Sequence, residues 1–99
     1  MALTGYPKTY ETPKIHIHSG SGAMSSALTG IFDLIKHTSS DPNDKVSIEI
    51  KKPGDSAETT IHVTAGDVVE GPFVSVKALA GGDVDGEVWI YERSSIVTD

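Results

Sequence analysis

The chain has 99 residues, of which 37% are hydrophobic and 22% charged, so one domain is expected because two ordinary cores would need more chain. Its formal net charge of −6 and its scattered lysines oppose binding to nucleic acid or to an anionic membrane. The absence of cysteine excludes disulfides, thiol catalysis and cysteine zinc sites.

No secretory signal and no apolar run of the ~20 residues that a membrane helix needs is found, so we expect a cytoplasmic protein. The predicted organisation is an extended N-terminal arm over residues 1–13, a single domain over residues 14–93, and a tail over residues 94–99. The tail is either a short edge strand or loose.

The N-terminal arm contains two prolines, which favour extended backbone, and the rings Tyr6 and Tyr10. These rings favour an arm that packs on its own subunit or on a neighbour. A frayed terminus is the alternative, because termini are commonly disordered unless they are docked.

Residues 14–18 alternate in polarity, with Ile15 and Ile17 on one face and His16 and His18 on the other, as in a half-buried strand. We expect the two imidazoles to face solvent.

Residues 23–37 carry apolar side chains at spacings of three and four, which predicts an amphipathic helix. Ser21 is its candidate N-cap, and His37 suits its C-terminal end. Gly30 would cost about 1 kcal/mol relative to alanine. The apolar stripe consists of Met24, Leu28, Ile31 and Ile35.

The remaining sequence predicts strands joined by turns. A polar loop over residues 38–44 precedes a hairpin made of strands 45–52 and 59–64, and a second hairpin joins strands 73–79 and 87–92. One helix among about five strands predicts an α+β domain, with a mostly antiparallel sheet or a small β-sandwich against which the helix packs.

The four histidines are the candidates for metal binding, because two histidines at i and i+2 on a strand can share a metal that a third ligand completes. No acidic residue accompanies the pair at a recognisable ligand spacing, so we expect no metal and no cofactor. The residues concerned are His16, His18, His37 and His62.

A Gly/Ser loop between the first strand and the predicted helix could bind an anion through bare backbone N–H groups. It has neither the lysine of a P-loop nor the third glycine of a dinucleotide fingerprint, so a flexible connector is favoured. A nucleophilic serine beside His16 or His18 is also conceivable, but the Gly-x-Ser-x-Gly pattern is not matched and no enzymatic activity is expected. The loop consists of Ser19, Gly20, Ser21 and Gly22.

Asp83, Asp85 and Glu87 bring three carboxylates into one turn. This segment is shorter than an EF-hand loop and lacks its distal glutamate. A solvated hairpin tip is therefore expected.

The last hairpin offers Trp89 and Tyr91 on one face together with Phe73, whereas the opposite alternating set supplies a core. If both faces are apolar, the helix can cover one and a neighbouring subunit or partner the other. A two-sheet sandwich that buries both sets is the alternative. The opposite set consists of Val74, Val76, Val88 and Ile90, and the predicted interface residues are Tyr6, Tyr10, Phe73, Trp89 and Tyr91.

The stretch Thr64–Leu79 carries Thr-Ala-Gly and then Gly-Pro-Phe ahead of an alternating strand, and Val88-Trp-Ile-Tyr91 follows a Gly/Asp turn. This pattern, over about residues 60–92, resembles the end of small virion structural proteins of tailed bacteriophages. The resemblance implies a repeated capsid, decoration or tail-associated subunit, located in the virion and without catalytic residues.

We therefore expect a non-enzymatic structural or assembly protein that acts through protein–protein contacts, as a homo-oligomer or as a component of a larger assembly. One alternative is a small acidic regulatory protein that inhibits a partner by occupying a basic surface. A second is an anion- or metal-binding domain that uses the Ser19–Gly22 loop with His16 and His18.

Overall fold

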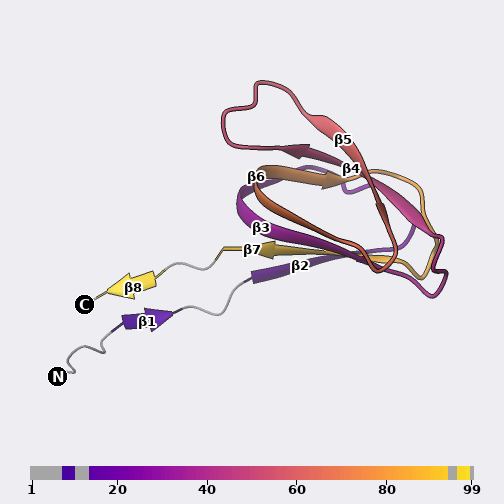
Figure 1. Cartoon of the computed structure of the whole chain (residues 1–99), viewed down its shortest axis with the longest axis horizontal. Coiled ribbons are helices and arrows are strands. Elements are labelled where there is room, and N and C mark those ends of the chain that lie inside the picture. The colour runs from indigo at the N-terminus through magenta and orange to yellow at the C-terminus, as the bar shows by residue number, and fades with distance from the viewer. Residues whose placement is uncertain (1–7, 11–13, 94–95, 99) are drawn as a thin grey trace.

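The computed structural model describes residues 8–10, 14–93 and 96–98, and these residues form strands and connecting loops only (Figure 1). Six strands make one sheet in the order β2-β7-β3-β6-β4-β5, with every neighbouring pair antiparallel, and β1 and β8 form a separate antiparallel pair. The strands are β1 (Lys8–Tyr10), β2 (Lys14–Ser19), β3 (Leu28–Thr38), β4 (Lys45–Lys51), β5 (Thr59–Thr64), β6 (Val68–Ala78), β7 (Glu87–Glu92) and β8 (Ile96–Thr98).

The helix expected over residues 23–37 is absent, so the α+β prediction is wrong and the described chain is all β. Most of that segment is β3, whose register shifts between Phe32 and Leu34 against both neighbouring strands. Such a bulge inserts one extra residue. Phe32 and Ile35 are therefore both buried although they lie three residues apart, a spacing that imitates the face of a helix.

Residues 20–27 form a loop that lies against the end of β6 rather than the first turns of a helix. The Met24 N–H donates to the Ala78 carbonyl at 2.9 Å, and the Ala78 N–H points at the Met24 sulfur at 3.1 Å. Met24 thus packs against the core as a loop residue. Ser21, the expected helix cap, uses its carbonyl to accept the Gly81 N–H at 2.8 Å.

Strand β6 begins at Val68, earlier than the expected start at residue 73, because the segment around Pro72 continues the strand. In this part β6 pairs with β3, whereas its pairing with β4 runs only over Ser75–Ala78. Proline is tolerated at position 72 because no strand pairs with this part of β6 on the β4 side, so no hydrogen bond to a second strand requires its missing N–H. Gly71 is required for space, because a Cβ at this position would lie 2.5 Å from the Phe32 carbonyl oxygen.

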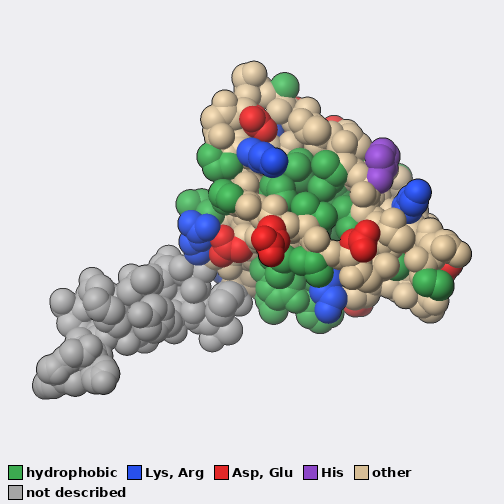
Figure 2. All heavy atoms as spheres, in the orientation of Figure 1, with side chains coloured by type: hydrophobic (Ala, Val, Ile, Leu, Met, Phe, Trp, Pro, Cys, Tyr) green, Lys and Arg blue, Asp and Glu red, His purple; other side chains and the backbone are tan. Residues whose placement is uncertain are grey.

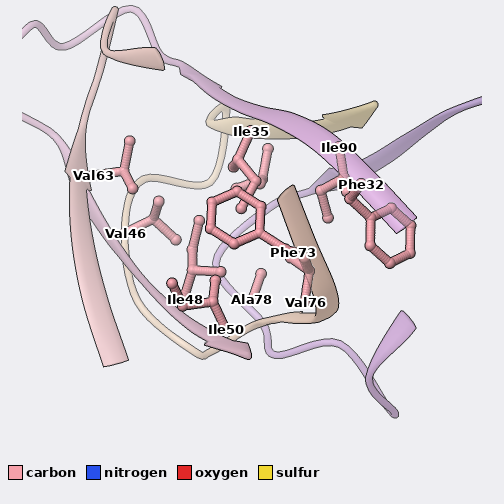
Figure 3. Packing of buried hydrophobic residues seen from close by; sticks show 11 residues of the cluster. Phe32, Ile35, Val46, Ile48, Ile50, Val63, Phe73, Val76, Ala78 and Ile90 are labelled. Atoms are coloured by element: carbon pink, nitrogen blue, oxygen red, sulfur yellow. The ribbon is translucent and has the colours of Figure 1, made fainter. Parts of the chain in front are cut away.

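The sheet curls so that its inner face encloses the core. β3 and β5 contact each other although β6 and β4 separate them in the sheet. At the closing point the Gly66 N–H donates to the His37 carbonyl at 2.8 Å. Figure 3 shows the Phe73 ring in the middle of the cluster and Phe32 at one end. The core consists of Phe32, Ile35, Val46, Ile48, Ile50, Val63, Phe73, Val76, Ala78, Val88 and Ile90.

Strands β1 and β8 continue the β2–β7 pair beyond the curled sheet (Figure 1). Tyr10 pairs with Ile96, and Lys14 pairs with Glu92, so both pairs share one register. Tyr10 has its backbone in β1, whereas Tyr6 lies outside the described residues. No helix long and apolar enough to span a membrane occurs among the residues that are described.

Candidate interaction surface

The outer face of the sheet carries several apolar side chains that do not belong to the core. β2 is an edge strand, and Ile15 and Ile17 on it are 46% and 50% exposed. His16 and His18 point to the inner face, since they pair with the buried residues Ile90 and Val88. The expected solvent-facing imidazoles and core-facing isoleucines are therefore reversed.

The register places the outward side chains in two neighbouring rows across β2, β7, β3 and β6. Cross-strand partners in antiparallel sheets point to the same side. The first row contains Ile15, Tyr91, Leu34 and Glu70, and the second contains Ile17, Trp89, Lys36 and Val68.

We call the six apolar members of these rows the outer patch: Ile15, Ile17, Leu34, Val68, Trp89 and Tyr91. Val68 is 50% exposed, and Leu34 and both rings are half-buried. Figure 2 shows hydrophobic side chains gathered over β2 and β7. A contiguous apolar surface of this kind usually marks an interaction site.

The two rings of the outer patch are held in place by local contacts. The Trp89 and Tyr91 rings stack with centroids 6.5 Å apart and planes inclined by 28°. The Trp89 indole N–H donates to the Glu87 carboxylate at 3.0 Å, which satisfies its one polar group. The ring faces are thus presented as rigid apolar surface, the kind of anchor that protein interfaces favour.

Phe73, predicted as a third member of this aromatic face, lies in the core with 0% exposure and cannot take part in an interface. The irregular pairing of β3 with β6 around Phe32 and Phe73 explains the error. Counting by twos from Val76 places Phe73 on the opposite side, whereas both residues are buried.

The histidines are dispersed rather than gathered around a common point. His16 Nε2 lies 2.8 Å from the Glu92 carboxylate, His18 Nε2 lies 2.6 Å from the Gly22 carbonyl, and His62 Nδ1 lies 3.0 Å from the Ser47 hydroxyl. Among the described residues, no three histidine, aspartate or glutamate side chains are grouped so that they could hold a metal ion. The metal-binding alternative therefore lacks a ligand set in this part of the chain.

His37 and Asp44 form a buried polar pair at the closing point of the curl, which sequence reasoning missed. His37 Nδ1 lies 2.8 Å from the Val63 carbonyl oxygen, and Nε2 lies 3.1 Å from the Asp44 carboxylate. The other carboxylate oxygen accepts the Asp83 N–H at 3.1 Å. Burial of such groups requires this full set of partners.

This pair resembles the acid–base half of a catalytic triad, but no substrate can reach it. His37 and Asp44 are 1% and 6% exposed. The adjoining cavity of about 10 Å³ has space for at most about one water. We therefore assign the pair to stability rather than to chemistry.

The main reason to expect an anion at the Ser19–Gly22 loop no longer holds, because a strand and not a helix follows the loop. The Gly20 N–H is already used, because it donates to the Gly86 carbonyl at 3.0 Å. The loop is thus joined to the acidic turn between β6 and β7, whose charge repels anions.

Carboxylates gather at this end of the sheet. Partial burial and the neighbouring charges of Asp44, Asp41 and Asp85 raise the pKa of Asp83 above its usual value. Ser40 donates to the Asp85 carboxylate. A shallow open depression nearby is lined by Thr38, Ser39, Ser40, Pro42, Ala65 and Gly66, none of which ionises in the ordinary pH range.

Comparisons with protein-family models, with curated proteins and with solved structures find no match to this chain.

Proposed function

We propose that the protein is a non-enzymatic structural or assembly subunit that works through protein–protein contacts made by the outer patch. The observation that carries the proposal is an exposed apolar row on the edge strand, with Ile15 and Ile17, continuous with the stacked rings of Trp89 and Tyr91. A chain that only had to fold could carry polar residues at these positions.

The mass of the full chain in solution tests this proposal. Light scattering after size exclusion is expected to show a discrete species heavier than the 10.4 kDa of one chain at high concentration. A monomer at every concentration would contradict assembly through copies of the same chain.

The resemblance of residues 60–92 to small virion structural proteins of tailed bacteriophages supports a more specific proposal, that the assembly is a capsid, decoration or tail-associated layer. Mass spectrometry of purified particles of the encoding virus is the matching measurement. A genome without head and tail genes around this one would contradict the virion role.

The acidic end of the sheet favours a second candidate, a regulatory protein that occupies a basic surface of its partner. The negative charges of Asp41, Asp44 and Asp85 repel the carboxylate of Asp83 and raise its pKa. A cationic partner bound at this end would relieve the repulsion. Such a complex should weaken steeply as salt rises. Retention of the partner at high salt would point back to the outer patch.

A further inference from the structure

We propose that the outer patch is the interface with a second copy of this chain, in which two sheets stack face to face about a twofold axis. This inference rests on the proposed assembly function and names its surface and its partner.

Charge is the first reason for choosing a second copy. The chain carries a net charge of −6, so two copies repel each other over most of their surfaces. The two rows of the outer face contain only one cation and one anion, Lys36 and Glu70. Neither belongs to an ion pair recorded among the described residues. The two rows therefore carry no net charge, although Glu87 in the adjoining row adds one acid on this side, so two acidic copies meet little repulsion over these rows.

The pattern of the two rows is also self-complementary. A twofold axis that lies in the interface and runs parallel to the rows exchanges the first row of one copy with the second row of the other. Ile15 then meets Ile17 of the second copy, and Tyr91 meets Trp89. Both contacts are apolar, and association would bury the surface that these four side chains still expose in the single chain.

The same symmetry operation aligns the charges. It places Lys36 of the second copy opposite Leu34, which is the immediate neighbour of Glu70 in the first row. Each Lys36 is therefore offset by one strand spacing, about 4.8 Å, along the row from the Glu70 position of the other copy, across the about 10 Å between stacked sheets, so the two long side chains can meet. Two equivalent ion pairs result, one on each side of the axis. A contact without this twofold symmetry, such as a head-to-tail contact, would not form the Lys36–Glu70 pair twice.

The size of the surface sets the expected affinity. Six apolar side chains and two ion pairs over four strands are at the small end of specific interfaces, so a dissociation constant on the order of micromolar is expected. Sedimentation velocity over a wide concentration range should then show a reversible monomer–dimer equilibrium.

The first test uses Ile17→Lys, with Val84→Lys as its matched control. Both replace an exposed apolar residue by lysine, but Val84 is 82% exposed in the turn between β6 and β7, outside the outer patch. Ile17→Lys should weaken the dimer by more than about tenfold, whereas Val84→Lys should not. Thermal unfolding of both variants confirms that the monomers are folded.

The second test is a charge exchange. Lys36→Glu alone and Glu70→Lys alone should each weaken self-association, because like charges then face each other across the axis. An equimolar mixture of the two variants should form a heterodimer, since both cross-axis pairs are again of opposite sign. Lys45→Glu mixed with Glu58→Lys gives the same charges on exposed residues outside the outer patch and should leave the dimer unchanged.

Each outcome decides between the possibilities. A dimer that persists in Ile17→Lys overturns this interface but leaves the proposed function intact. A heterodimer that fails to form in the mixture overturns the face-to-face arrangement, because pairing through the β2 edge would not respond to Lys36 or Glu70. A wild-type chain that stays monomeric at every concentration overturns this interface and, beyond it, any assembly through copies of the same chain.

Discussion

The two faces of the sheet use the same strands but different side chains. On β7 the inward residues are Val88 and Ile90, which are buried, whereas the outward residues are Trp89 and Tyr91. The only tryptophan of the chain thus lies outside the core. Medium-sized aliphatic residues and two phenylalanines fill the inner face, so the core does not need the large rings on the outer face, which is why we propose them as contact residues.

The largest effect on stability is expected at the buried polar pair of the inner face. His37→Ala removes the imidazole that contacts the Asp44 carboxylate and the Val63 carbonyl. Both oxygens then stay buried without the hydrogen-bond partner that the imidazole provided. We expect a loss of about 3–5 kcal/mol in the free energy of unfolding, measured by urea denaturation at pH 7. His62→Ala is the control, and as an exposed site it should change stability by less than about 0.5 kcal/mol.

Two isoleucines compare the faces directly. Ile48→Ala empties a fully buried position and should cost about 3 kcal/mol, whereas Ile17→Ala at a position 50% exposed should cost less than about 1 kcal/mol. Denaturant midpoints report the stability, and sedimentation reports the dimer. Similar losses of stability for the two variants would show that the outer face contributes to folding as strongly as the core.

The smallest effect concerns Asp83 at the acidic end. Because its pKa is raised in the folded chain, the ionised carboxyl destabilises the fold above its ordinary pKa of 3.8, and protonation removes this penalty as the pH falls. Asp83→Asn should therefore raise the melting temperature at pH 7, with no difference from the wild type at pH 3. A lower melting temperature for the variant at pH 7 would show that the charge is useful to the fold.

Four of the strands could be predicted because their alternation is regular. β4, β5 and β7 lie within one residue of the expected bounds, and β2 extends its expected range by one residue. The face of β2 could not be predicted, since alternation defines two faces without saying which one is covered. The buried partners of His16 and His18 lie on β7, far along the chain.

The bulge in β3 and the early start of β6 are the features that the sequence pattern predicts worst. An extra residue between Phe32 and Leu34 shifts the period of the strand, and only pairing with β6 and β7 makes the bulge evident. Of the outer patch, Trp89 and Tyr91 were predicted as interface residues, whereas Leu34 and Val68 were assigned to the helix and to a connection. Their place on one surface follows from the strand order, which no local pattern contains.

The shared register of β1–β8 and β2–β7 has a consequence for how the chain reaches its fold. β1 pairs with β8 and β2 with β7, so forming either pair closes a loop that contains most of the chain, which is slow. A circular permutant that links Thr98 to Lys8 and opens the exposed turn 53–58 would turn this distant pair into a hairpin. Stopped-flow refolding should then be faster than for the natural chain order, with the same curled sheet as its product.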